Sequence, residues 1–478
     1  MGFSFVFFYF FERERLILKT CGSLASAVGV LETKFTDKTK NDFTETVLTG
    51  GGFEKYPNKY ELIEVDYGCS DDDDAESEIA ADSESDKENV DQTSKKSKKS
   101  TESIKKEATE SKLNPELQTF LKLICDLKRM EAKVKEMNFD TKRSPLGKVK
   151  TDQIKKGYEI LTEVEERLRG KNKTSSLVQL TSQYYTKIPH DFGMRVPPVI
   201  RDIDMLKNEI LLLETLADIE IVTKLVKKKK EEMNKLHPLD RNYQDLNCKL
   251  TDAGKTEVEK IKMLLKWTHA GTHDMYKSIE LVKAFKSECA VQNSQSFKKF
   301  QGMKRKMLWH GTRVSNIAGI LKQGLRIAPP EAPVTGYMFG KGVYFADSAS
   351  KSANYCQPSS DDNERVIILA DVAIGNPLEV YKADYEADKK VKDSTEYDST
   401  FGVGRTQPAS EAKFQGSFIP KVAKTTKECV LKDIELERES ELQYNEYVVY
   451  DPEQVNIKFV CHIKFKFGEE GEEEDSLW

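Results

Sequence analysis

Three stretches of the chain combine residue types that could carry chemistry. "GYMFGKGVYFADSASKSANYC" runs from Gly336 to Cys356 and joins glycines, lysines, aromatics and small hydroxyl residues. "LWHGTR" places His310 at the end of an apolar strand, next to Gly311, and "YNEYVVYD" places Glu446 at the start of another. An imidazole, a carboxylate and aromatic rings on strands of one domain indicate a pocket for a flat aromatic ligand.

The first stretch is not a phosphate-binding loop. A P-loop needs four residues between its glycines and then Lys and Ser or Thr, whereas Gly340 and Lys341 are followed directly by Gly342. A dinucleotide-binding G-x-G-x-x-G between a strand and a helix is absent as well. The eight cysteines show no C-x-x-C pair and no Cys/His spacing typical of zinc, so we expect reduced thiols and no metal.

The three stretches lie within residues 236–478, where short strands alternate with Gly and Pro. The expected strands are "KMLWHG", "KGVYFAD", "RVIILADVAIG", "NEYVVYD" and "VNIKFVCHIKFKF". Helices are expected over "TEVEKIKMLLKW" and "NIAGILKQG". Strands without regular βαβ alternation predict an α+β domain with a mostly antiparallel core, which positions His310 and Glu446 at strand ends.

Residues 113–235 have a helical period and predict an all-α bundle. Asn114 followed by Pro115 is typical of a helix N-terminus, and one helix is expected over "ELQTFLKLICDLKRMEAKV". Its apolar face comprises Leu117, Phe120, Leu121, Ile124, Leu127 and Met130. A second helix is expected from Thr151 to Gly170. The third and longest covers "DIDMLKNEILLLETLADIEIVTKLVKKKK", whose basic end suits the helix dipole.

The N-terminal part of the chain differs in composition. Residues 1–67 look like the end of a small β-containing domain, because "KYELIEVDYG" alternates as a strand does. Residues 68–112 join an acidic and a basic block with almost no large apolar residue, which predicts a disordered linker. The net charge is −5, so contact with nucleic acid depends on local patches. The patch "KKSKKSTESIKK" fits a nuclear-import signal, a DNA-backbone contact or a solubilising linker.

From Leu308 to Cys356, and again at "YNEYVVYD", the chain closely resembles the catalytic domain of the poly(ADP-ribose) polymerases. The helical region, with "PLGKV" and "YYTKIPHDFG", looks like that family's regulatory domain, and "FEKYPNKYELIEVDYG" looks like the tail of its WGR domain. The short N-terminus without zinc fingers is most similar to the smaller DNA-dependent type. The chain has no W-G-R tripeptide, so its WGR-like domain is expected to be truncated.

The resemblance implies four parts in order along the chain. These are a truncated WGR-like domain (1–67), a disordered charged linker (68–112), a helical regulatory domain (113–235) and an ADP-ribosyltransferase catalytic domain (236–478).

The resemblance also implies catalytic residues, because the family's H-Y-E triad falls on His310, Tyr344 and Glu446. His310 would hold the adenosine-side ribose of NAD+, and Tyr344 would stack against the nicotinamide riboside. Glu446 would bind the 2′-hydroxyl of that ribose and orient the acceptor. Breaking the nicotinamide–ribose bond develops oxocarbenium character, which a nearby carboxylate stabilises.

Further NAD+ contacts are implied by the same resemblance. The backbone of Gly311 and the hydroxyl of Ser352 would bind the nicotinamide amide, with Tyr355 stacking on the ring. Thr312 and Arg326 would contact the adenosine and phosphate portion. The acceptor side falls on Met338, Lys351 and Tyr444.

The implied function is an NAD+-dependent protein poly-ADP-ribosyltransferase that uses NAD+ as substrate, releases nicotinamide and needs no metal. A glutamate at the position of Glu446 goes with chain elongation in the superfamily, so polymer is expected. The implied partners are acceptor proteins including the chain itself, DNA strand breaks, and chromatin and repair proteins, in the nucleus and away from membranes. The alternatives are a mono-ADP-ribosyltransferase, separated by product length, and a non-catalytic DNA-repair scaffold, separated by NAD+ consumption.

Overall fold

The computed structural model describes residues 24–48, 52–54, 56, 57, 59, 110–146, 148–170, 176–226, 236–423, 430–436 and 438–468. The chain falls into two compact units, residues 1–66 and 67–478. The described part of the first unit contains helix α1 (Leu24–Thr39) and a π-helical turn at Thr44–Leu48. The strand expected over "KYELIEVDYG" lies, except for one residue, outside the described residues.

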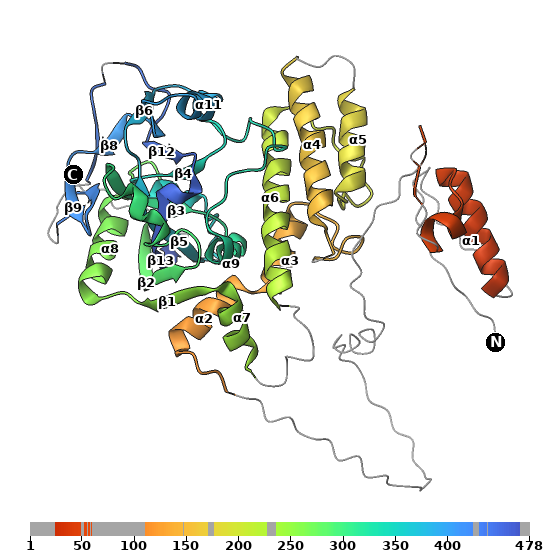
Figure 1. Ribbon diagram of the computed structural model, residues 1–478, viewed down its shortest axis with the longest axis horizontal. Coiled ribbons are helices and arrows are strands. Elements are labelled where there is room, and N and C mark those ends of the chain that lie inside the picture. The colour runs from red at the N-terminus through yellow and green to blue at the C-terminus, as the bar shows by residue number, and fades with distance from the viewer. Residues whose placement is uncertain are drawn as a thin grey trace, which may run out of the picture. The chain divides into compact units, whose positions relative to one another are not determined.

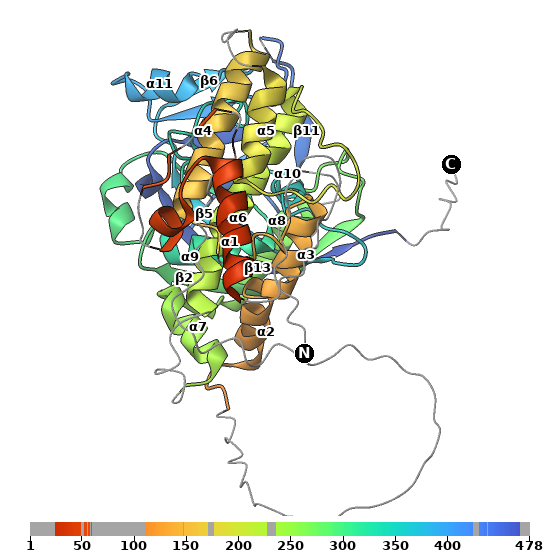
Figure 2. The same cartoon turned by 90° about the vertical axis from the view of Figure 1, so that its right-hand side faces the viewer.

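The second unit begins with helices, as the sequence predicts for this region. They are α2 (Pro115–Ile124), α3 (Leu127–Glu136), α4 (Thr151–Leu168), α5 (Leu177–Lys187), α6 (Ile203–Val226) and α7 (Pro238–Leu246). In Figure 1 and Figure 2, α4 and α5 run side by side, and α6 packs on α4. The Asn114 side chain accepts a hydrogen bond from the Leu117 amide, and Pro115 is the first helical residue, which confirms the predicted N-terminus.

The single helix expected over "ELQTFLKLICDLKRMEAKV" is two helices. α2 ends at Ile124, and α3 begins at Leu127 after Asp126, whose side chain accepts from the Arg129 amide. The prediction of one helix was wrong because the apolar spacing continues from Ile124 to Leu127 across the break. Asp126, a typical N-cap residue, is the local signal for the new start.

The other two predicted helices are confirmed. α4 begins at Thr151 and α6 covers Ile203–Val226, while the basic run after α6 lies outside the described residues. α5 was not predicted, although Ser176 and Gln179 form a capping box at its start.

A seven-stranded sheet forms the centre of the second unit. In spatial order its strands are β1 (Cys248–Asp252), β2 (Ser278–Cys289), β13 (Val455–Lys466), β5 (Glu364–Ala373), β3 (Arg305–Gly311), β10 (Ser417–Pro420) and β9 (Glu411–Phe414). All neighbours pair antiparallel except β3 and β10. The predicted strands β3, β5 and β13 lie at its centre, whereas β2, with its many charged residues, was not predicted.

A smaller, four-stranded sheet carries the remaining predicted strands. Its order is β4 (Val343–Phe345), β12 (Glu446–Val449), β7 (Ser399–Gly402) and β6 (Pro377–Val380). β8 (Thr406–Pro408) and β11 (Leu431–Asp433) form a separate pair. The Trp309 amide donates to the Ala346 carbonyl (2.8 Å) and the Ala346 amide to the Trp309 carbonyl (3.0 Å), so these bonds join the two larger sheets. The predicted α+β architecture with mostly antiparallel sheets is confirmed.

Helices cover both faces of the large sheet. Leu308 of β3 belongs to a core shared with α9 (Val314–Gln323) and α6, whereas its neighbour Trp309 packs with α8 (Lys255–Trp267). α9 lies between the sheet and α6 (Figure 1). The helices between residues 115 and 226 and the sheet therefore share one continuous hydrophobic core.

β1 and β2 are joined by a disulfide between Cys248 and Cys289, which lie opposite each other in the register. The expectation that every cysteine is reduced was therefore wrong. The two residues are 41 positions apart, so no local spacing indicates the bond. Cys125, Cys356 and Cys461 are free thiols.

Reduction of this disulfide should destabilise the fold. Cross-linking residues 41 positions apart stabilises by roughly 4 kcal/mol in the chain-entropy treatment. We expect dithiothreitol to lower the melting temperature of the wild type, and to leave that of a Cys248→Ala/Cys289→Ala variant unchanged. Equal melting temperatures of the wild type with and without reductant would contradict the prediction.

Candidate active site

The end of β3 lies against β4. The Nδ1 atom of His310 lies 2.9 Å from the carbonyl oxygen of Tyr344. Because a carbonyl oxygen only accepts, Nδ1 carries the proton and Nε2 keeps its lone pair. Burial lowers the pKa of His310, which favours the neutral ring. The imidazole is thus prepared to accept a hydrogen bond from a hydroxyl group.

Tyr344 and Glu446 share one face of the four-stranded sheet. Tyr344 lies opposite Val448, two residues beyond Glu446, so the two side chains point the same way. The Tyr344 hydroxyl donates to the Gly340 carbonyl (2.7 Å) and accepts from the Phe339 amide (2.9 Å). Burial raises the pKa of Tyr344 well above its usual value. The hydroxyl fixes the turn, and the ring is left as a stacking surface.

Lys351, on α10 (Ala349–Asn354), holds Glu446. Its Nζ lies 2.9 Å from Oε1 of Glu446 and donates to the carbonyls of Tyr444 (3.0 Å) and Asn445 (3.1 Å). An ammonium has three donors, and Lys351 places one on each of three consecutive residues. A carboxylate fixed in this way can bind a hydroxyl group and stabilise developing positive charge.

β3 and α10 approach each other closely at Gly311. A Cβ atom at this position would lie 1.6 Å from the carbonyl oxygen of Ser352, so a larger residue does not fit. The Ser352 hydroxyl donates to the Trp309 carbonyl (2.9 Å), which leaves its oxygen to accept. Tyr355 follows one turn later with 60% of its surface exposed. A backbone edge, a hydroxyl acceptor and an exposed ring thus lie within one short segment.

The regulatory helix α6 reaches this region with two carboxylates. Asp218 forms an ion pair with Arg326, and Glu214, one turn earlier, accepts from the Tyr337 hydroxyl. Burial raises the pKa of Asp218 to about 7 and also raises that of Glu214, while Arg326 and Tyr337 oppose these shifts. Arg326 is therefore held by a protein carboxylate.

Tyr444 turns its side chain away from Glu446. It is buried, its hydroxyl contacts Thr272, and its ring centre lies 4.9 Å from that of His273. Tyr444 therefore meets Lys351 only through its carbonyl oxygen.

Thr312 directly follows β3, and Met338 lies in the segment before β4. The Thr312 hydroxyl accepts from the Asn316 side chain (3.0 Å) in the first turn of α9. Met338 lies partly buried next to the turn that Tyr344 fixes, and its carbonyl accepts from the Asp384 amide (3.0 Å).

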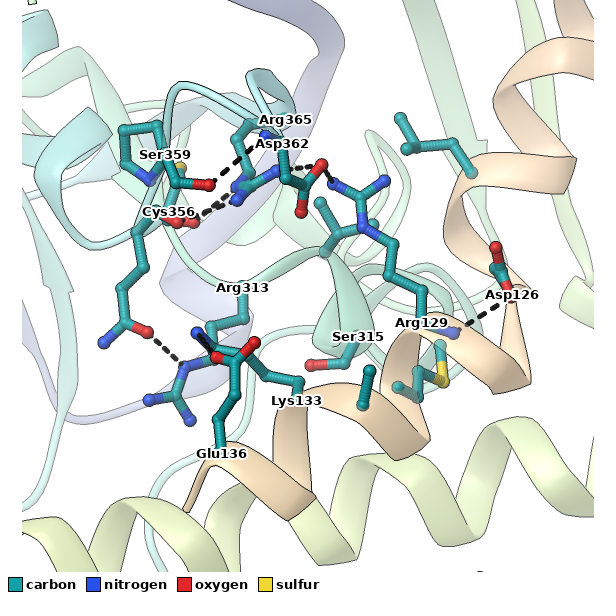
Figure 3. Close-up of a pocket in the computed structure, with 16 residues that line it drawn as sticks. Asp126, Arg129, Lys133, Glu136, Arg313, Ser315, Cys356, Ser359, Asp362 and Arg365 are labelled. Carbon is teal, nitrogen blue, oxygen red and sulfur yellow. Dashed lines mark hydrogen bonds and ion pairs between the residues drawn. The ribbon is translucent and has the colours of Figure 1, made fainter.

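A cavity of about 400 Å³ lies between α3 and residues 356–365 (Figure 3). Across it, Asp362 forms an ion pair with Arg129 of α3, and on its own side it pairs with Arg365 of β5. Arg313, the residue after Thr312, lines the same cavity. None of the triad residues lines it, so the cavity marks the junction of helical region and sheet rather than the site itself.

The groups gathered around the triad are a neutral imidazole, a lysine-bound carboxylate and aromatic rings. Within the described part of the chain, no three His, Cys, Asp or Glu side chains lie close enough to hold a metal ion. Over the same residues, no helix is long and apolar enough to cross a membrane. The groups present are suited to binding hydroxyls and a planar ring.

Sequence reasoning missed Glu214 and Asp218. They are spaced i, i+4 and interrupt the apolar run "LLLETLADIEIV", so they share one helix face. Charged side chains on a buried face need partners, and this anomaly is the signal that could have identified them. Their partners, Tyr337 and Arg326, lie more than a hundred residues away.

Replacing Gly311 tests the close approach of β3 and α10. We expect Gly311→Ala to destabilise the fold by about 1–3 kcal/mol, because the new methyl group overlaps the Ser352 carbonyl. Because the resemblance implies that the Gly311 backbone binds nicotinamide, the variant should also lose the thermal shift that nicotinamide produces. The matched control is Gly271→Ala, since a Cβ there meets no atom within 4 Å. An unchanged shift in Gly311→Ala would contradict this placement of the ligand.

Two family models match the chain. "Poly(ADP-ribose) polymerase, regulatory domain" matches residues 111–243, and "Poly(ADP-ribose) polymerase catalytic domain" matches residues 255–465. The human "Poly [ADP-ribose] polymerase 2" is 38% identical over 95% of the chain and 72% of the relative. The Arabidopsis thaliana protein of that name is 38% identical over 92% of the chain and 64% of the relative. The Danio rerio "Poly [ADP-ribose] polymerase 1" is 37% identical over 91% of the chain and 39% of the relative. The chain therefore spans less than two thirds of the Arabidopsis and Danio relatives.

The matched regions correspond to the two parts of the second unit. His310, Tyr344 and Glu446 lie within the catalytic-domain match, and Asp218 lies within the regulatory-domain match. The chain therefore belongs to the poly(ADP-ribose) polymerase family, whose enzymes transfer ADP-ribose and use NAD+ as their substrate.

Proposed function

We propose that this chain transfers ADP-ribose from NAD+ to protein side chains and extends the product into poly(ADP-ribose), releasing nicotinamide. The observation that supports this most is the placement of Glu446 on the same face as Tyr344, in an ion pair with Lys351 and next to the His310–Tyr344 contact. These groups come from three separate segments and meet in one place.

The nicotinamide end of NAD+ binds between Gly311, Ser352 and the two tyrosines Tyr344 and Tyr355. The Gly311 backbone and the Ser352 hydroxyl bond the carboxamide, and the rings stack on the flat base. His310 uses its free Nε2 lone pair to accept from a ribose hydroxyl on the adenosine side. Thr312 and Arg326 contact the adenosine and phosphate portion.

Glu446 acts where charge develops. As the bond between nicotinamide and ribose breaks, the ribose gains positive character, and the Glu446 carboxylate binds its 2′-hydroxyl and stabilises that charge. The same carboxylate orients the acceptor hydroxyl for attack. Lys351 keeps Glu446 in place and, with Met338 and the Tyr444 backbone, borders the acceptor side.

Glu446→Gln tests this assignment. The amide keeps the size of the side chain but loses the charge, so polymer formation should fall by roughly 10²–10⁴-fold while the melting temperature stays near that of the wild type. Gel analysis of product length and release of nicotinamide measure the two steps separately. Full polymer from Glu446→Gln would contradict the role, and single units from the wild type would favour mono-ADP-ribosylation. No NAD+ consumption by the wild type under any condition would favour the scaffold.

We further propose that the helical region restrains the enzyme. The Asp218 carboxylate is ion-paired with the Arg326 guanidinium. The phosphate portion of NAD+ needs the same guanidinium, so NAD+ and α6 compete for it. DNA strand breaks would favour the state in which α6 has moved away, as a shift between two populations. Nuclear localisation, automodification and partners in chromatin and DNA repair belong to the same proposal, which the similarity to poly(ADP-ribose) polymerases 1 and 2 supports.

Asp218→Ala should release this restraint. Because Arg326 is 46% exposed, its charge remains solvated when Asp218 is removed. We expect activity without DNA to rise about 5-fold or more, with a lower KM for NAD+ and unchanged activity at saturating DNA. Asp204→Ala on the exposed side of α6 is the control. Equal activities of Asp218→Ala and Asp204→Ala without DNA would count against the competition.

A further inference from the structure

The two neighbours of Glu446, Asn445 just before β12 and Tyr447 within it, are held on the opposite face of the sheet. Successive side chains of a strand point to opposite faces, so Asn445 and Tyr447 point away from the face that carries Glu446. Both are buried, with 1% and 2% of their surface exposed. A group that binds both of them on the opposite face therefore fixes the backbone of Glu446, which lies between them.

One carboxylate binds both neighbours. The Oδ2 atom of Asp347 accepts from the Asn445 side-chain amide at 2.8 Å and from the Tyr447 hydroxyl at 3.1 Å. Asp347 itself is only 3% exposed and lies two residues after β4. Phe345 of β4 pairs with Tyr447, so Asp347 continues along the same face.

The network extends to both sides of this carboxylate. The Asn445 side-chain oxygen accepts from the Gly404 amide (2.9 Å), just beyond β7. The Tyr447 hydroxyl also accepts from Nζ of Lys306 (3.0 Å), a buried residue of β3 that forms an ion pair with Glu411. Segments next to β4, β12, β7 and β3 are therefore tied together directly below Glu446.

Two ammonium groups, those of Lys306 and Lys351, partly offset the burial of the Asp347 charge. Lys306 lies on one side and Lys351, the partner of Glu446, acts from the other. Burial still raises the pKa of Asp347, because the loss of water outweighs the two ammonium groups and the two hydrogen bonds. A buried carboxylate needs hydrogen-bond partners, and Asn445 and Tyr447 supply them here.

We infer that Asp347 is a positioning residue for the transfer reaction: by binding Asn445 and Tyr447 it holds Glu446 in the place where it meets the ribose and the acceptor. The inference rests on the proposed function, since it assigns Glu446 to elongation. Lys351 fixes Glu446 from the reacting face and Asp347 fixes its neighbours from the opposite face, so Glu446 is located from two directions.

The test compares variants at Asp347 in the full chain. Asp347→Ala leaves Asn445 and Tyr447 without their acceptor, and it should lower kcat about 10- to 100-fold with the KM for NAD+ within twofold of wild type. Because elongation depends on Glu446, products should also shorten toward single units. Asp347→Asn should restore most of kcat and product length, since its amide oxygen can accept both hydrogen bonds.

The matched control is Asp371→Ala. Asp371 is a carboxylate of the same domain that is just as buried, 1% exposed, and binds Ser417 and Arg305 rather than any neighbour of Glu446. It should lower the melting temperature without shortening the products. If Asp347→Ala does not fold, Tyr447→Phe, which keeps its ring stacked on Phe401, removes one of the two bonds and should shorten products partially.

The outcomes separate the inference from the proposed function. If Glu446→Gln loses polymer while Asp347→Ala and Tyr447→Phe match the wild type, the positioning role of Asp347 is overturned and the function stands. Equal shortening of products in Asp371→Ala would also overturn it, because general destabilisation would then explain the effect. If the wild type makes no polymer, the proposed function fails first.

Discussion

The close approach of Gly311 to the carbonyl of Ser352 is the constraint on which the site depends. It sets the distance between the end of β3 and α10, and α10 carries Lys351 as well as Ser352. Through Lys351 the same approach determines where Glu446 lies, and through β3 it determines where His310 meets β4. A side chain at position 311 would displace both halves of the site at once.

The charges of the site come from distant parts of the chain and cross the boundary between helices and sheet. α6 supplies carboxylates to the catalytic domain, where Arg326 forms an ion pair with that of Asp218. α3 supplies Arg129 to Asp362 at the cavity of Figure 3. Because each of these pairs joins a regulatory helix to a catalytic segment, a change in the position of the helices changes the electrostatics of the catalytic domain directly.

Much of the fold and of the site could be predicted from the sequence, and the limits have physical reasons. β3, β4 and β12 carry apolar residues in short runs, with Gly in or beside β3 and β4, and their motifs carry the three residues proposed as the triad. β2 was missed because charged residues alternate through it at the edge of the core. The break between α2 and α3 was missed because the apolar period runs through it.

Contacts between residues far apart in the sequence could not be predicted from local sequence patterns. Asp218 and Arg326 are 108 positions apart, and Asp347 meets Asn445 only because β4 and β12 pair. The disulfide of Cys248 and Cys289 likewise depends on the pairing of β1 and β2. Motifs indicate which residues are candidates for the reaction, whereas the residues that hold them are determined by the tertiary structure.

The continuous core that joins α6, α9 and β3 has a consequence for the lifetime of the enzyme. Helices that share a core with the catalytic sheet cannot loosen without exposing the apolar face of α9 to water. In the activation proposed above, such loosening would therefore lower the stability of the catalytic domain in the same step. On that proposal, an activated molecule would be closer to unfolding than a resting one, and its own architecture would limit how long it works.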